Sequence, residues 1–353
     1  MSAAVVVAAA LGAARRLGVP VRDPAVLRES SSVIVLLAPD GPVARVAAVS
    51  AEIEVTGERR PVAEAAQPDQ LGCRVMPVFD NDGRPLYYEV HGDGEPLLCV
   101  MGLSADHLAW TLQVPAWSRR FKTVVFDNRD AGQSFRCEGP YDVSDMAQDT
   151  LALADGLGLD RFHVLGMSLG GTIAQEVALA APDRVRTLTL VVTFAWAGRW
   201  GREFARLWSR AAAQRSDEEH LDWLILQTVS EEFYENEQAV EFLRNVMLAN
   251  PHPQPRDAFI RQLEAGARHD ARGRLGALSM PVHVIGAERD LLVPVFKSEE
   301  IAELVPGAKL SIVPRAPHGL NVERAEEFNA LVADFIASAP APAPALGLGA
   351  GAE

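Results

Sequence analysis

The sequence has few cysteines and a deficit of positive charge. Its 353 residues include three Cys, and 33 Lys and Arg stand against 47 Asp and Glu, a formal net charge of −14. Cys73, Cys99 and Cys137 are far apart, odd in number and without C-x-x-C spacing. This argues against a disulfide framework and against a cysteine zinc site. We therefore expect a reducing compartment, the cytoplasm.

The acidic balance also limits the partners. Nucleic acids and anionic membranes are bound through basic surfaces, so the sequence predicts neither, and a small neutral molecule fits better. No stretch offers the roughly 18 uninterrupted apolar residues that a membrane span needs. The opening MSAAVVVAAALGAARRLG has no basic segment before its apolar run, with Arg15 and Arg16 after it, so we do not expect a signal peptide.

Residues 1–75 differ in composition from the rest of the chain and are treated as an N-terminal extension. They are rich in Ala and Val, and the turn-forming residues 39–42, PDGP, separate the β-prone runs SVIVLLA and VARVAAV. This pattern predicts a helix followed by a β-hairpin.

From Met76 onward, short apolar runs alternate with amphipathic segments. The runs are PLYYEV, EPLLCVMG, FKTVVFDN, RFHVLGMS, RTLTLVVT, PVHVIGA and AKLSIVP. Such runs are typical of strands buried on both faces, and their alternation with helices predicts an α/β fold with a mostly parallel sheet covered by helices on both faces.

The chain is therefore divided into an extension, a core, an insertion and a tail. Residues 76–195 and 273–338 form the α/β core. Residues 196–272 contain helical sequence without a convincing strand, together with four of the six tryptophans, and are predicted to form a helical cap. Residues 339–353 are rich in Pro, Ala and Gly and are expected to be disordered.

One pentapeptide contains a candidate catalytic residue. Gly166-Met167-Ser168-Leu169-Gly170 has the form G-x-S-x-G and lies between a predicted strand and a predicted helix. In that context the serine is presented on a strained turn, and the flanking Gly166 and Gly170 are needed because side chains there would collide with strand and helix. Ser168 is therefore the candidate nucleophile.

A serine hydroxyl needs a base to accept its proton during attack. His318 is chosen because it follows the last predicted strand in a loop that opens onto the final helix. His163 and His283 lie within predicted strands and are interpreted as core residues. The other histidines are interpreted as surface residues of loops or of the cap: His91, His107, His220, His252 and His269.

The histidine in turn needs an acid to orient it. The segment VIGAERDLLVP offers Glu288 and Asp290, and Asp290 is preferred because it comes later in the loop and precedes Pro294 by four residues. Two backbone N–H groups should stabilise the oxyanion that forms on attack. These are assigned to Leu169, at the start of a helix, and to Leu103, where Gly102 lets its loop approach the site.

With these residues in place, the sequence resembles the α/β-hydrolase superfamily over residues 76–338. The order Ser168, Asp290, His318 is that of the superfamily. Further likeness lies in GDGEPLL, FDNRDAGQS, DMAQDTLALADGLGLDRFHVLGMSLGG and APDRVRTLTLVV. The resemblance is greatest to 3-oxoadipate enol-lactonase-like and small bacterial esterase-like members. Two departures are Met101-Gly102, where many members have His-Gly, and Arg129-Asp130, where many have Arg-Gly.

The extension has a weak resemblance of its own. Residues 1–60 are similar to the start of an aminoglycoside phosphotransferase-type N-lobe. The HGD tripeptide at His91 to Asp93 is then a candidate kinase loop, but Leu98 stands where the metal-binding Asn is needed and no Gly-rich phosphate loop precedes it. The tripeptide is interpreted as a hydrolase turn.

The resemblance and the triad together predict a serine hydrolase that cleaves a carboxylic ester or lactone through an acyl-enzyme, with neither cofactor nor metal. Met167, Trp196, Trp200 and Trp223 are candidate lining of an apolar substrate pocket. Hydrolases of carbon–carbon bonds and cofactor-free perhydrolases use the same triad and remain alternatives. A non-catalytic ligand receptor on the same fold is the alternative of another class. The sequence leaves open whether the protein is a homo-oligomer.

Overall fold

The computed structural model describes residues 78–339 and, before them, the backbone of several short strands. These strands are β1 Ala25–Glu29, β2 Ser32–Leu36, β3 Val43–Val46, β4 Glu52–Val55, β5 Glu58–Pro61 and β6 Cys73–Arg74. The chain divides into two compact units, one of residues 1–73 with 235–251 and one of residues 74–234 with 252–353.

In the first unit, β2 pairs antiparallel with β3, and β1 pairs antiparallel with β2. Strands β4 and β5 form a separate antiparallel pair. The unit also contains α8 Glu237–Leu248. The helix predicted before the hairpin and the tail after residue 339 lie outside the described residues, and the domain boundaries remain predictions.

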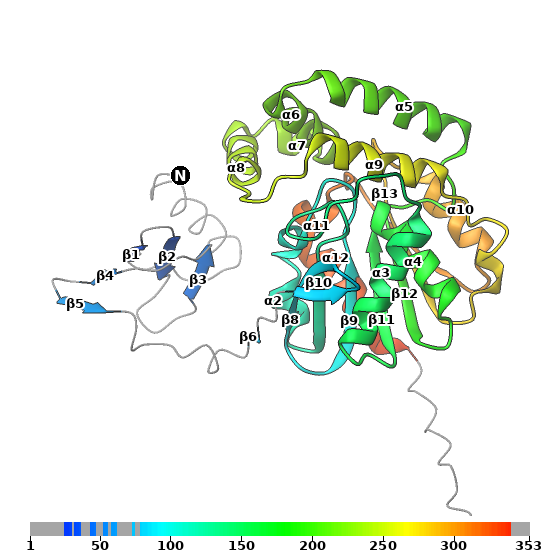
Figure 1. Ribbon diagram of the computed structural model, residues 1–353, viewed down its shortest axis with the longest axis horizontal. Helices are drawn as coiled ribbons and strands as arrows, with labels where there is room; N and C mark the ends of the chain where they lie inside the picture. The colour runs from blue at the N-terminus through cyan, green and yellow to red at the C-terminus, as the bar shows by residue number, and fades with distance from the viewer. Residues whose placement is uncertain are drawn as a thin grey trace, which may run out of the picture. The chain divides into compact units, whose positions relative to one another are not determined.

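The second unit contains a mostly parallel sheet, so the predicted α/β fold is confirmed. The strands run in the order β14-β13-β12-β11-β9-β10-β8, and β7 pairs with β8 (Figure 1). Every neighbouring pair from β14 to β10 is parallel, whereas β8 is antiparallel to both β10 and β7. The bounds are β7 Val78–Asn81, β8 Arg84–His91, β9 Glu95–Val100, β10 Phe121–Phe126, β11 Phe162–Met167, β12 Val185–Val191, β13 Val282–Ala287 and β14 Lys309–Val313.

Helices connect these strands and cover the sheet. Those of the core are η3 His107–Trp110, α2 Val114–Trp117, α3 Val143–Gly156, α4 Leu169–Ala180, η4 Leu275–Ala277, α10 Phe296–Leu304, α11 Leu320–Glu323 and α12 Ala325–Ser338. Between β12 and β13 the second unit inserts α5 Gly198–Gln214, α6 Asp217–Thr228, α7 Glu231–Tyr234 and α9 Arg256–Arg268. None of the described helices is long and apolar enough to cross a membrane.

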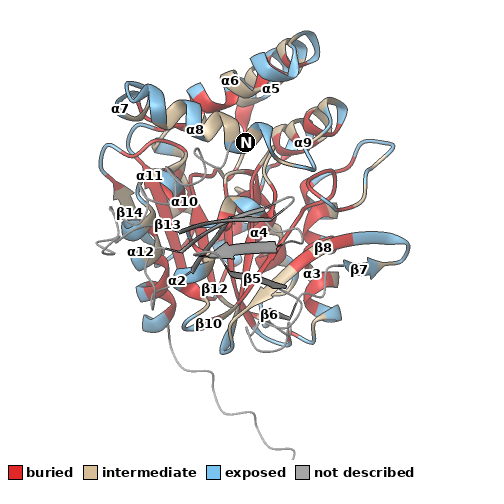
Figure 2. Cartoon of the chain, turned by 90° about the vertical axis from the view of Figure 1, so that its left-hand side faces the viewer, coloured by how far each residue is buried: buried red, intermediate tan, exposed pale blue. Residues whose placement is uncertain are grey.

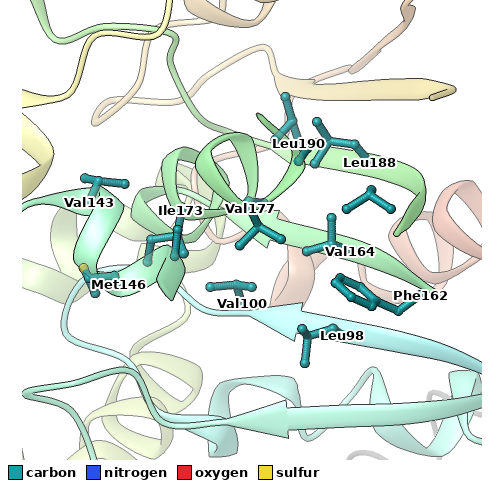
Figure 3. Packing of buried hydrophobic residues seen from close by; sticks show 14 of the residues in the cluster. Leu98, Val100, Val143, Met146, Phe162, Val164, Ile173, Val177, Leu188 and Leu190 are labelled. Carbon is teal, nitrogen blue, oxygen red and sulfur yellow. The ribbon is translucent and has the colours of Figure 1, made fainter. Parts of the chain in front are cut away.

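The strands are buried on both faces because their side chains alternate between two apolar clusters. In β9, Leu98 and Val100 join a cluster with Met146 of α3 and Ile173 of α4 (Figure 3). Leu97 and Cys99 belong to the cluster on the other face, which also holds residues of α2 and α12. Figure 2 shows the central strands as buried and the outer faces of the helices as exposed.

A matched pair of substitutions tests this packing. Leu188 of the central strand β12 is 0% exposed, whereas Leu310 of the edge strand β14 is 39% exposed. Leu188→Ala removes buried methyl groups and leaves a cavity, so we expect the free energy of unfolding to fall by about 2–5 kcal/mol. Leu310→Ala should lower it by less than about 1 kcal/mol. Denaturant unfolding of both variants measures the difference, and equal losses would contradict the two-faced core.

Candidate active site

Ser168 lies on a strained turn between β11 and α4. Its backbone has φ 57° and ψ −122°, a region that L-residues rarely adopt. The turn is fixed from two sides, because the Ser168 N–H donates to the Val191 carbonyl at 2.8 Å and its own carbonyl accepts from Thr193 Oγ1 at 2.7 Å. Ser168 itself is half-buried, so its hydroxyl is held in a fixed position without being sealed off.

The glycines around Ser168 allow three segments to meet. A Cβ on Gly166 would collide with the carbonyl of Gly170, and a Cβ on Gly170 would collide with the carbonyls of Val100 and Met101. A Cβ on Gly102 would lie 2.9 Å from the Ser168 Cβ. The loop after β9 therefore packs directly against the serine because these positions have no side chains.

The structure brings the three candidate triad residues together from the ends of three strands. His318 Nε2 lies 3.0 Å from Ser168 Oγ, and His318 Nδ1 lies 2.7 Å from Asp290 Oδ2. The Asp290 side chain is fully buried, and its Oδ1 accepts from the N–H groups of Leu292 and Val293, each at 2.8 Å. These two hydrogen bonds therefore orient the carboxylate independently of its contact with the imidazole.

Glu288, the other acid considered, has a different contact. Its Oε2 accepts from the Arg315 N–H at 2.7 Å, whereas the Asp290 carboxylate faces His318. The structure thus places the carboxylate of Asp290, rather than that of Glu288, against His318. The loop of His318 is held from α6, because the Gly319 N–H donates to the Thr228 carbonyl at 2.7 Å.

The two candidate oxyanion donors lie next to residues that contact Ser168. Leu169 is the first residue of α4, so its N–H has no acceptor within the helix. Leu103 follows Gly102, and the Asn128 side chain fixes this loop by donating to the Met101 carbonyl at 2.8 Å. Within residues 78–339, neither N–H has an intramolecular acceptor, so both are free to donate to a bound oxyanion.

Two of the remaining histidines are core residues, as their strand positions indicated. His163 contacts Thr187 Oγ1 at 2.8 Å and is 0% exposed, and burial lowers its pKa. His283 contacts Ser311 Oγ at 2.9 Å, and burial lowers its pKa to about 4. Both rings are therefore neutral near pH 7. The other ring nitrogen of His163 lies 3.1 Å from Glu95 Oε2, but neither ring joins a serine to a carboxylate as His318 does.

The apolar surroundings of the site come from a cluster that the sequence did not reveal. Trp208, Leu224 and Phe259 are buried together, and Leu103 and Leu292 pack against them. Leu103 follows the oxyanion loop glycine, and Leu292 follows Asp290 by two residues. Residues of α5, α6 and α9 therefore contact both loops of the site.

The residues predicted to line the pocket have other surroundings. Trp196 donates to Glu300 of α10 and lies under the Arg272 guanidinium. Trp200 is 59% exposed, and Trp223 is 38% exposed.

Met167 is buried in the cluster on the α12 face of the sheet. The observed contacts therefore favour Trp208, rather than the four residues proposed from the sequence, as part of the apolar surroundings of the site. The sequence does not show that Trp208 of α5 packs against Phe259 of α9. The periodicity of α5 therefore gave no signal for Trp208.

Comparison with known proteins agrees with this architecture. A family model described as the alpha/beta hydrolase fold matches residues 95–325. RutD of Azorhizobium caulinodans, provisionally named a carbamate hydrolase, is 30% identical over 261 residues, which cover 74% of this chain and 98% of the relative.

Two solved structures are similar over the same part of the chain. A hydrolase from Pseudomonas aeruginosa is 30% identical with a TM-score of 0.67, covering 73% of this chain and 97% of its own. An enol-lactonase from Burkholderia xenovorans is 25% identical with a TM-score of 0.66, covering 74% of this chain and 100% of its own.

A second histidine–carboxylate contact joins the segment after β9 to the loop after β10. Asp127 Oδ1 accepts from both the N–H and the Nδ1 of His107, at 2.8 and 2.7 Å. With Asp106 these residues are the one group in the described part of the chain whose geometry could hold a metal ion. Because Asp127 Oδ1 already accepts two hydrogen bonds and Oδ2 accepts a third from Gln133 N–H, we interpret the group as a hydrogen-bonded support.

The charge of this support depends on pH. Burial lowers the pKa of His107, but the hydrogen bond and charge of Asp127, together with the charge of Glu89, outweigh burial and raise it above 6.5. A histidine whose pKa is higher in the folded state than in the unfolded state stabilises the fold at pH values below its unfolded-state pKa. This stabilisation is lost as the pH rises through its folded-state pKa.

We therefore expect His107→Gln to destabilise the protein most near pH 6 and progressively less toward pH 9, relative to the unchanged protein. Melting temperatures of both proteins across this range measure the effect. A difference that grows as pH rises would show that the charged form of His107 is not stabilised in the fold.

Proposed function

The chain belongs to the alpha/beta hydrolase fold family and is a hydrolase, and on that premise we propose that it cleaves a carboxylic ester or lactone of a small, largely apolar substrate through an acyl-enzyme. The observation that carries the proposal is the unbroken contact from Asp290 through His318 to Ser168. This arrangement suits nucleophilic attack on a carbonyl carbon.

In the acylation step, Ser168 Oγ attacks the carbonyl carbon while His318 Nε2 accepts the hydroxyl proton. Asp290 accepts a hydrogen bond from Nδ1, which fixes the tautomer and stabilises the imidazolium. The carbonyl oxygen becomes an oxyanion, to which Leu103 and Leu169 donate from the backbone, and the dipole of α4 adds to this stabilisation. The imidazolium then returns its proton to the departing alkoxide, and the acyl-enzyme forms.

In the deacylation step the same groups act on water. His318 accepts a proton from water, the resulting hydroxide attacks the acyl carbon, and the proton is returned to Ser168 Oγ as the acid product leaves. In a lactone the alcohol and the acid belong to one molecule. Its hydrolysis therefore opens the ring and gives a single hydroxy acid as product.

The apolar substrate is supported by the cluster of Trp208, Leu224 and Phe259 that contacts both loops of the site. Aliphatic and aromatic side chains recognise apolar groups through burial and leave few polar contacts for a charged substrate. The similar enol-lactonase structure supports the lactone arm of the proposal.

A carbamate is the second candidate substrate, because several similar curated proteins carry the RutD name. A carbamate carbonyl is attacked in the same way as an ester carbonyl, with an amine or alkoxide as the leaving group. It is less electrophilic, because the nitrogen lone pair is delocalised onto the carbonyl. The same triad therefore serves both substrate classes.

Replacement of the nucleophile tests the mechanism. We expect Ser168→Ala to abolish both ester turnover and covalent labelling by a fluorophosphonate, because within residues 78–339 no other hydroxyl is paired with His318. Asp290→Asn should keep the fold and lower kcat by about four orders of magnitude. Ser338→Ala, at an exposed position at the end of α12, is the control and should leave both readouts unchanged. Ester turnover by Ser168→Ala would reject the acyl-enzyme.

A substrate panel distinguishes the candidates. Aryl esters, enol-lactones and aryl carbamates are compared by kcat/KM, and we expect the esters or lactones to exceed carbamates of matched leaving group. Vinylogous diketones and peroxide-dependent oxidation report the carbon–carbon hydrolase and perhydrolase alternatives. Carbamate turnover above that of the matched ester would replace the proposed substrate class, and tight ligand binding without any turnover would favour a receptor.

A further inference from the structure

The turn after β10 contains a buried carboxylate in an unusual backbone conformation. Asp130 has φ 67° and is 0% exposed. Its N–H donates to the Phe135 carbonyl at 2.9 Å, and its Oδ1 accepts from the Cys137 N–H at 2.9 Å. Left-handed backbone conformation is disfavoured for a residue with a side chain, so the interactions of this carboxylate must offset the strain.

Further interactions come from the cap, from helix α9 and the segment just before it. Arg261 Nε lies 2.8 Å from Asp130 Oδ2, and Arg261 Nη2 lies 3.0 Å from Oδ1, a two-pronged ion pair. The neighbouring backbone is engaged as well, because Gln254 Nε2 donates to the Asp130 carbonyl at 2.9 Å and Gln262 Nε2 donates to the Arg129 carbonyl at 2.7 Å. Three cap side chains therefore hold one core turn.

The ion pair is an obligatory contact for electrostatic reasons. A fully buried carboxylate needs an opposite charge, and the one that meets Asp130 side chain to side chain is on the cap. Arg261 has a second partner, Asp257, on its own helix, but Asp257 is 70% exposed at the side chain and screened by solvent. Displacement of α9 would leave the Asp130 charge buried and unpaired.

The same helix contacts the catalytic elbow farther along. A Cβ on Gly266 would lie 2.9 Å from Leu169 Cδ1, and Leu169 directly follows the nucleophile. Phe259, Ile260 and Leu263 of the same helix contribute to the apolar cluster that meets Leu103. The position of α9 therefore sets the position of apolar side chains near Ser168.

From these contacts we propose that Asp130 and Arg261 are positioning residues that fix α9 over the nucleophile elbow and thereby select for substrates with a long apolar acyl chain. This inference rests on the proposed ester hydrolysis. A long chain reaches the side chains of α9, whereas an acetyl group contacts only the elbow and the oxyanion loop. Loosening α9 should therefore weaken binding of long esters and leave short ones unaffected.

The test compares 4-nitrophenyl octanoate with 4-nitrophenyl acetate as substrates of the full chain. Asp130→Asn keeps the shape of the side chain, and Asn tolerates a positive φ. We expect kcat/KM for the octanoate to fall about 10- to 100-fold, mainly through KM, while the value for the acetate changes by less than about twofold. Arg261→Lys keeps the charge without the planar fork and should give an intermediate loss.

The matched control is Asp257→Asn. It removes the other ion pair of Arg261, at 2.7 Å, and leaves the Asp130 contact intact. We expect both substrates to be hydrolysed as by the unchanged protein. Equal losses for octanoate and acetate in Asp130→Asn, or no loss for either, would overturn the proposal, because a purely structural role does not discriminate chain length.

Hydrogen–deuterium exchange separates this inference from the proposed function. Amides of residues 256–268 should exchange faster in Asp130→Asn than in Asp257→Asn, whether or not an ester is cleaved. If the unchanged protein hydrolyses neither ester, the ester arm of the proposed function fails. Protected exchange in Asp130→Asn would separately reject the contact as a support of α9. Should Asp130→Asn fail to fold, Asp130→Gly removes the carboxylate and the backbone strain together and is measured in its place.

Discussion

The left-handed backbone of Ser168 is the constraint on which the active site depends. A residue with a side chain adopts this conformation only where its surroundings hold it there, and here β12 binds the Ser168 N–H while Thr193 binds its carbonyl. Close approach of the β9 loop is possible only because Gly102 and Gly170 have no side chains. The parallel sheet thus fixes a hydroxyl at its carboxyl edge, where the loops of β13 and β14 bring the acid and the base.

The insertion between β12 and β13 is hydrogen-bonded to loops that carry the candidate catalytic residues. Thr228 of α6 accepts from the Gly319 N–H, and Ser230 binds Glu323 through both its N–H and its hydroxyl. Residues of α9 bind the turn at Asp130. Leu103 and Leu292, in two loops of the site, also pack against the apolar cluster of the insertion, so the insertion contacts the site through both polar and apolar residues.

Much of the fold and the triad could be predicted because the signals are local. A buried parallel strand is a continuous apolar run, and the G-x-S-x-G turn needs small residues at fixed positions, so both are visible within a few residues of sequence. Chain order then identified His318 and Asp290 among several histidines and acids. The part of Trp208 in the apolar cluster could not be predicted, because the sequence does not show which tryptophan of a helix lies on its buried face. Trp208 faces Phe259, whereas Trp200, eight residues earlier, is exposed.

The Arg129-Asp130 departure from the usual Arg-Gly was visible in the sequence, but its partner was not. Asp130 and Arg261 are 131 residues apart, and no sequence pattern near either residue predicts their ion pair. The sequence by itself determined which strands and helices form and where a candidate nucleophile, acid and base stand along the chain, because hydrophobic period and turn chemistry act over short distances. Only the tertiary structure decided which distant groups meet, because ion pairs and apolar contacts between separate elements depend on how those elements pack.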